Sequence, residues 1–184
     1  IGKISMKNPV MVASGTFGYG PEYSELMDLN LLGAIVVKGI MVEPWEGNEV
    51  PRMVEVTGGL VNAIGLQSPG VDRFVQDYMP FLRKTSIAVI VNVWGRNVME
   101  YAEVVRRLSG VDGVHGIELN ISCPNVKEGG IAFGTDVKMA CSVVAAARKV
   151  TSLTLITKLS PNVPDIGMFA KAVEEAGSYA LSLI

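Results

Sequence analysis

Polar side chains recur at one kind of position in this sequence, the end of a short apolar run. Ser14, Lys38, Asn92, Asn120 and Lys158 each stand at or next to the carboxyl end of such a run. A buried lysine is costly unless it is paired or engaged with an anion, whereas asparagine can donate and accept hydrogen bonds at once. The set therefore indicates a site for an electron-rich ligand that also needs to be oriented.

The period of two in a β-strand allows an internal test of this set. In the run 116–121, Glu118 and Asn120 fall on one face, and in the run 154–159 Lys158 shares a face with Ile156. We expect these faces to form the interior of a barrel. An alternative is that Lys38 or Lys158 forms an internal salt bridge with Glu118, which needs no ligand.

Cys123 follows the fourth apolar run directly, in the stretch Asn120-Ile-Ser-Cys-Pro-Asn125 ahead of Gly129-Gly130. A free cysteine is most often a small buried apolar residue. However, a thiol with an ordinary pKa of about 8.5 can accept a proton near neutral pH where lysines favour the thiolate. Its place above the expected pocket favours a chemical role. Cys141 lies in an Ala-rich helical pattern and is expected to pack.

Six apolar runs alternate with helical patterns along the chain. We interpret as strands residues 10–14, 34–38, 88–93, 116–121, 154–159 and 180–184, and as helices residues 21–32, 71–82, 97–109, 136–150 and 164–177. An insertion at about 40–70 interrupts the alternation, and Thr57-Gly58-Gly59 within it predicts a hairpin turn. Because the insertion follows a strand, we expect it at the carboxyl end of the sheet.

Repeated βα units fit either a doubly wound open sheet or a (β/α)₈ barrel. Polar residues at the carboxyl ends of the first five strands favour the barrel, whose active site is built there. The spacing of Gly15, Gly18 and Gly20 does not match the dinucleotide-binding fingerprint. We therefore expect an α/β TIM barrel, of which residues 1–184 would supply the first six strands, or three quarters of one domain.

Composition excludes several functional classes. Sixteen basic and 18 acidic residues give a net charge of −2, without the basic clusters of a nucleic-acid surface. No run approaches the roughly 20 apolar residues of a membrane span, and no signal peptide is seen, so a cytosolic location is expected. Two cysteines cannot form a disulfide scaffold, and no His or Cys cluster has metal-ligand spacing. His115 and the pair Arg106-Arg107 are expected at the surface.

Five segments in order resemble the signature segments of dihydroorotate dehydrogenases. They are Ala13-Ser-Gly-Thr-Phe-Gly18, Asn62-Ala-Ile-Gly-Leu66, Val91-Asn-Val93, Asn120-Ile-Ser-Cys-Pro-Asn125 and Lys158-Leu-Ser-Pro-Asn162. A loop cysteine, where membrane-associated members carry serine, is similar to the cytosolic class. The continuation Val126-Lys-Glu-Gly-Gly130 and Ala132-Phe-Gly-Thr135 resembles the form that passes electrons to NAD more than the fumarate-using form.

The resemblance implies FMN as cofactor and a role for each matching residue. FMN would contact Ser14, Lys38, Gly39, Asn92, Asn120, Lys158 and Ile184, and substrate would contact Lys38, Asn62, Ala63, Ile64, Gly65, Leu66 and Asn120. Cys123 would be the catalytic base that removes the C5 proton of (S)-dihydroorotate while a hydride passes from C6 to flavin N5. This reaction makes orotate in pyrimidine (UMP) biosynthesis.

The same resemblance implies partners and a longer chain. It implies a homodimer joined to an electron-transfer subunit that carries FAD and an iron–sulfur cluster. Members continue with two further βα units, whose loops usually hold the phosphate in this fold, so we expect 184 residues alone to be inactive. Two alternatives remain open: a barrel like that of dihydropyrimidine dehydrogenase, which Asn125 disfavours, and an inactive half-barrel that only binds a partner.

Overall fold

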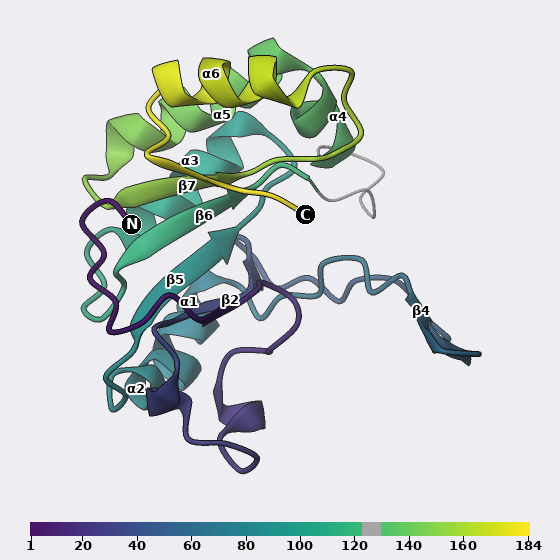
Figure 1. Ribbon diagram of the computed structural model, residues 1–184, viewed down its shortest axis with the longest axis vertical. Helices are drawn as coiled ribbons and strands as arrows, with labels where there is room; N and C mark the ends of the chain where they lie inside the picture. Colours follow the sequence, from purple (N-terminus) through teal and green to yellow (C-terminus); the bar gives the residue numbers. More distant parts are fainter. Residues whose placement is uncertain (123–129) are drawn as a thin grey trace.

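The computed structural model describes all residues except 123–129 and shows a curled, six-stranded parallel sheet (Figure 1). Its strands run in the order β1-β2-β5-β6-β7-β8. Their bounds are Met11–Val12 (β1), Ala34–Ile40 (β2), Ala88–Val93 (β5), Gly116–Asn120 (β6), Thr154–Lys158 (β7) and Ala180–Ser182 (β8). All six expected strands are confirmed. The sheet is an open arc of a barrel, as expected for its first six strands.

Helices connect these strands, and three of them begin at a side-chain cap. Their bounds are Val98–Leu108 (α3), Val137–Val150 (α5) and Ile166–Glu175 (α6). Asn97, Asp136 and Asp165 each accept a hydrogen bond from a backbone N–H three residues later. None of the described helices is long and apolar enough to cross a membrane.

The helical region after the insertion is continuous but not uniformly α-helical. It consists of α1 (Val71–Arg73), a π-helical turn η3 (Phe74–Tyr78) and α2 (Met79–Leu82). Pro80 lacks a backbone N–H, and its ring would crowd the preceding turn of a regular α-helix. The widened turn directly before it relieves that conflict.

Two expectations about helices need correction. Residues 21–32 do not form one helix but two 3₁₀ turns, η1 (Pro21–Tyr23) and η2 (Leu29–Leu31). The backbone at Asp28 is extended, and its side chain accepts from the N–H of Asn30, so a new turn starts there. A short helix, α4 (Gly130–Thr135), was not expected and precedes α5.

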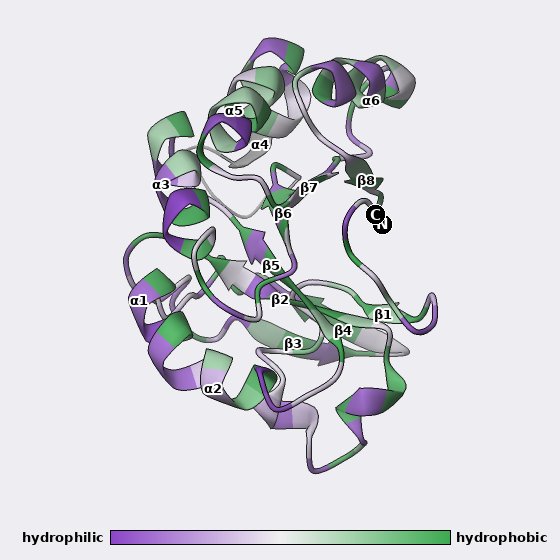
Figure 2. Ribbon diagram, turned by 90° about the vertical axis from the view of Figure 1, so that its left-hand side faces the viewer, coloured by the Kyte–Doolittle hydropathy of each residue, from purple (hydrophilic) through white to green (hydrophobic). Residues whose placement is uncertain are grey.

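The two faces of the sheet bury different residues. The outer face packs under the helices in one large apolar cluster, which includes Val91, Ile117 and Leu155. A smaller cluster lines the inner face and consists of Ile4, Ala34, Val36, Ala88, Ile90 and Ile156. Figure 2 shows the helices ranged along the outer side of the arc. The inner residues alternate with the outer ones, so the predicted assignment of Ile156 to the interior is confirmed.

The insertion contains the expected hairpin, β3 (Met53–Val56) and β4 (Gly59–Asn62), which extends away from the sheet (Figure 1). Val56 pairs with Gly59, so Thr57 and Gly58 form the two-residue turn. Gly58 has a φ of 80°, a left-handed conformation that glycine adopts without strain. The side chains of both strands are exposed.

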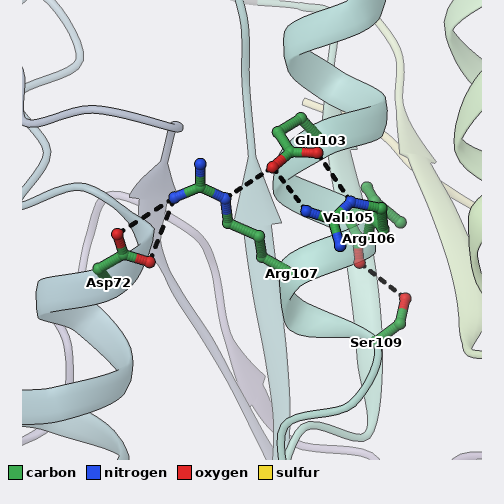
Figure 3. Close-up of polar contacts among 6 residues, drawn as sticks. All are labelled: Asp72, Glu103, Val105, Arg106, Arg107 and Ser109. Carbon is green, nitrogen blue, oxygen red and sulfur yellow. Dashed lines mark hydrogen bonds and ion pairs between the residues drawn. The ribbon is translucent and has the colours of Figure 1, made fainter.

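Arg106 and Arg107 are not simply a solvated pair (Figure 3). Both donate to Glu103 one turn earlier on α3, and Arg107 also donates to Asp72 on α1. Hydrogen bonds from Arg106 and then Arg107 lower the pKa of Glu103 to about 2. Arg106 remains exposed, as expected, whereas Arg107 connects two neighbouring helices.

Candidate functional site

A cavity of about 350 Å³ opens at the carboxyl ends of the strands, where the polar set was expected to gather. The cavity is lined by Ser14, Gly15, Lys38, Gly39, Arg52, Asn62, Ile64, Gly65, Leu66, Gln67, Asn92, Asn120, Ser122, Lys158 and Ile184. Four neighbouring strands, β2, β5, β6 and β7, carry a polar residue at the end of the inner face: Lys38, Asn92, Asn120 and Lys158. The register of the sheet places Asn92 beside Glu118 and Asn120 beside Lys158.

Asn92 is the centre of a hydrogen-bond network under this cavity. Its Nδ2 donates to Oε1 of Glu118 at 2.6 Å and to Oγ of Ser14 at 3.3 Å. Ser14 Oγ also accepts from Nζ of Lys158 at 3.1 Å. Among the described residues no ion pair joins Glu118 to Lys38 or Lys158, so the salt-bridge alternative is not what the structure shows.

Asn120 extends the network along the next strand. Its Nδ2 donates to Oδ1 of Asn92 at 3.4 Å, and its Oδ1 accepts from the backbone N–H and the hydroxyl of Ser122. Its backbone carbonyl accepts from the hydroxyl of Tyr101, on α3, at 2.7 Å. Asn120 is therefore held from both sides of the sheet, with few alternatives for its side-chain orientation.

Lys38 projects from the end of β2 and is half-buried. Burial lowers its pKa, and the positive charge of Arg52 lowers it further, while Glu22 raises it. Both cations line the same cavity, with Lys158 as a third. An anionic or electron-rich ligand would relieve this repulsion, because an opposite charge nearby favours the protonated form of a lysine.

Residues at the base of the hairpin line one side of the cavity, and Arg52 connects the two arms of the insertion there. The guanidinium donates to the carbonyls of Glu46 and Asn48 and, at 2.7 Å, to Oε1 of Gln67. Leu66 has a φ of 58°, a left-handed conformation that is uncommon for a bulky residue and costs on the order of 1–3 kcal/mol. Such strain persists only where surrounding contacts enforce it, and Leu66 packs against the large apolar cluster and lines the cavity.

The structure brings most of the expected contact residues to one place. All the expected cofactor residues line the cavity, as do Asn62, Ile64, Gly65 and Leu66 from the expected substrate set. Ala63 does not line it; this residue is exposed, and its backbone bonds to Arg52 and Asn48. Its contact with substrate remains a prediction. Cys123, the expected base, lies outside the described residues.

Four lining residues were not identified from the sequence: Gly15, Arg52, Gln67 and Ser122. Gly15 follows Ser14, and Ser122 lies two residues after Asn120. Both could have been predicted to line the cavity from their proximity to these polar strand ends. Arg52 and Gln67 lie on either side of the hairpin, where a hydrogen bond joins them, and only the tertiary structure places the base of the hairpin beside the cavity.

His115 and Cys141 do not line the cavity, and neither does the buried Trp94 beside Gly39. His115 is exposed, and its Nδ1 accepts from the backbone N–H of Val89. The thiol of Cys141 contacts the carbonyl of Ala172 on α6, and burial raises its pKa, as expected for packing. Trp94 is 2% exposed and packs edge-on against Trp45 at 6.1 Å between ring centroids.

Comparison with known proteins identifies the family of this arrangement. The family model described as dihydroorotate dehydrogenase matches residues 1–184. The chain is 53% identical over 181 residues to the catalytic subunit of dihydroorotate dehydrogenase B (NAD⁺) of Citrifermentans bemidjiense, covering 98% of this chain and 59% of that protein. The corresponding protein of Thermoanaerobacter pseudethanolicus is 52% identical over 184 residues, covering 100% and 61%.

A solved structure supports the fold independently. The crystal structure of a dihydroorotate dehydrogenase from Eimeria tenella, in complex with ferulenol, superposes with a TM-score of 0.75 at 20% identity, covering 98% of this chain and 59% of that one. The chain thus spans about three fifths of the length of the relatives it matches. Since the family match extends over every residue given, this chain belongs to the dihydroorotate dehydrogenase family.

Proposed function

We propose that the protein containing this chain oxidises (S)-dihydroorotate to orotate with FMN, as a step of pyrimidine biosynthesis. The observation that carries the proposal is the cavity at the strand ends, which is lined by three cations and by the Ser14–Asn92–Asn120 network. Family membership supports the reaction class, and the 52–53% identical relatives support the NAD-linked form.

The cavity suits the pyrimidine edge of a flavin and a substrate carboxylate. Lys158 and Ser14 present hydrogen-bond donors from neighbouring parts of the inner wall. A flavin edge offers carbonyl and ring-nitrogen acceptors and gains negative charge on reduction, which a nearby lysine stabilises. When bound there, FMN would supply the two-electron acceptor for the hydride from C6 of the substrate.

The chain's own residues would orient the substrate and move its proton. Lys38 and Arg52 would attract the substrate carboxylate, and Asn62 and Asn120 would hold its ring carbonyls and N–H groups. Gly65 and Leu66 would restrict the ring's position and exclude water. Cys123, by family resemblance, would take the C5 proton as a thiolate.

Electron transfer to NAD⁺ requires a further proposal. The relatives are named catalytic subunits of an NAD⁺ enzyme, and we infer a homodimer of the catalytic chain that joins an iron–sulfur flavoprotein with FAD. Orotate formation coupled to NAD⁺ reduction should then need the added subunit, whereas an artificial acceptor should suffice without it. NAD⁺ reduction by the catalytic chain alone would contradict this arrangement.

The direct test compares Cys123→Ala with Cys141→Ala in the complete protein. A general base contributes about 10²–10⁴-fold, so Cys123→Ala should retain the flavin absorbance and lose at least about 100-fold in dihydroorotate oxidation. Cys141→Ala should keep both, because its thiol packs against Ala172.

Each alternative has its own outcome. A colourless complete protein would favour the binding-only half-barrel, and a yellow protein that acts on dihydropyrimidines instead would favour the dihydropyrimidine dehydrogenase-like barrel. Normal turnover by Cys123→Ala would refute the proposed base. A polypeptide of residues 1–184 alone should fail to retain flavin or turn over dihydroorotate.

A further inference from the structure

Glu118 is a buried acid under the candidate site to which the proposed reaction gives no role. Its side chain lies on the inner face of β6, and the residue is only 4% exposed. It does not line the cavity, and Asn92 stands between it and Ser14. A buried carboxylate is expensive, so its single short bond to Asn92 suggests what it does.

The bond to Glu118 decides which way the Asn92 amide faces. An ionised carboxylate has only acceptors, so it requires the NH₂ group of Asn92 and disfavours its carbonyl. The two hydrogens of that NH₂ group are then used by Glu118 and Ser14. Asn92 Oδ1 must consequently face the other way, toward the Nδ2 of Asn120.

The orientation of Asn92 passes on to two of its neighbours that also line the cavity, Asn120 and Ser14. Asn120 must donate to Asn92, and its own Oδ1 is occupied by the N–H and hydroxyl of Ser122, which leaves one N–H for the cavity. Ser14 Oγ accepts from Asn92 and Lys158, which uses both of its lone pairs, so its hydroxyl hydrogen is left to donate.

We propose that Glu118 is a positioning residue which, through Asn92, forces Ser14 and Asn120 to present only hydrogen-bond donors to the cavity. On this part of the wall, the groups left to donate to a ligand are the Ser14 O–H, one Asn120 N–H and the remaining N–H groups of Lys158. Such a wall selects a ring edge made of hydrogen-bond acceptors. It binds the ring most tightly in the redox state that carries negative charge, which for a flavin is the reduced state. The identity of that ring as a flavin rests on the proposed function.

Direct electrostatics and positioning predict opposite effects when Glu118 is replaced. Removing a negative charge near a flavin would by itself favour the reduced, more negative form and raise the midpoint potential. Losing the imposed amide orientation would turn acceptors toward the ring, disfavour that form and lower the potential. The sign of the shift therefore separates the two roles.

The test is the midpoint potential of the flavin in the complete protein, with Glu118→Leu and Glu118→Gln. We expect Glu118→Leu to weaken reduced-flavin binding relative to oxidised about tenfold, a fall of about 30 mV for a two-electron couple. Glu118→Gln keeps a hydrogen-bond acceptor for Asn92, so its midpoint potential should be higher than that of Glu118→Leu. An unchanged or raised potential in Glu118→Leu, or equal values for both variants, would overturn the proposal.

Two further variants keep the test decisive. Thr157→Val removes a fully buried polar contact, to Ser178, from the outer face of the neighbouring strand, and should leave the potential unchanged. Ser14→Ala deletes the donor that Glu118 is proposed to orient, in a half-buried position, and should lower the potential even if Glu118→Leu does not fold. No fall in Ser14→Ala would also overturn the proposal.

The wild-type protein separates this inference from the proposed function. A colourless wild type, or one inactive on dihydroorotate, would refute the proposed function and the flavin assignment with it. A yellow, active wild type whose Glu118 variants show no lowered potential would refute the positioning role alone.

Discussion

Gly39 is the residue whose enlargement tests most directly how tightly the site is packed. A Cβ at this position would lie 3.0 Å from Oδ1 of Asn92 and 3.0 Å from Cδ1 of Trp94. Neither neighbour can easily move, because Glu118 holds Asn92 at 2.6 Å and Trp94 is 2% exposed. Gly39→Ala should therefore both strain the core and displace the amide at the centre of the network.

The expected loss of stability in Gly39→Ala is the difference between two opposing effects. Overpacking a well-filled core costs about 1–3 kcal/mol. Replacing glycine by alanine stabilises by about 0.4–1 kcal/mol, because it reduces the conformational freedom of the unfolded chain. A net loss of about 1.5 kcal/mol should lower the melting temperature of the complete protein by about 2–3 °C, given an unfolding entropy of about 2.1 cal/mol/K per residue over a length of about 300 residues. Displacement of Asn92 should also weaken flavin binding, measured by flavin release.

Gly110→Ala is the matched control. No atom lies within 4 Å of a Cβ at Gly110, and its backbone is outside the left-handed region, so this variant should be as stable as the wild type or slightly more stable. Thermal unfolding of both variants, monitored by circular dichroism, gives the comparison. If Gly39→Ala unfolds at the same temperature as Gly110→Ala and retains its flavin, the packing described around Asn92 is wrong.

Two further predictions concern groups that contact the site. The pKa of Lys38 is lowered on folding, so between that lowered pKa and the ordinary value of about 10.5 the unfolded chain holds more protons than the folded one, and stability should increase with pH. Lys38→Met should flatten this increase in ligand-free protein, and a profile parallel to that of the wild type would contradict the cause assigned to the shift. Tyr101→Phe removes a 2.7 Å bond to the Asn120 carbonyl and should cost about 1 kcal/mol in urea unfolding, with an unchanged midpoint showing that this bond contributes nothing.

Local sequence patterns were sufficient to predict most of the strands and helices and to assign residues to the two faces of the sheet. The strand at residues 88–93 was predicted with its observed bounds, and the helix predicted over residues 97–109 begins at its cap, Asn97. These features depend on residues close in sequence, through period-two alternation and bonds spanning three residues. The polar strand ends could be predicted for the same reason, since parallel strands end at one edge.

Residues 21–32 show where local patterns fail. Their composition is compatible with a helix, but Asp28 satisfies the N–H of Asn30 in an extended conformation. A side chain that can cap a turn competes with the helix it would otherwise continue. Which state is formed depends on the packing of neighbouring residues such as Leu29, which is buried in the core.

The sequence by itself determined the barrel class, the strand ends that supply the site and the family. Only the tertiary structure decided the partners within the site. A salt bridge between Glu118 and a lysine was one alternative, but Glu118 bonds to Asn92 from the adjacent strand. Arg52 lines the cavity from the insertion, a segment distant in sequence from most of the strand ends. Sequence periodicity specifies the face on which a side chain lies, whereas hydrogen-bond partners depend on distances between segments far apart in the chain.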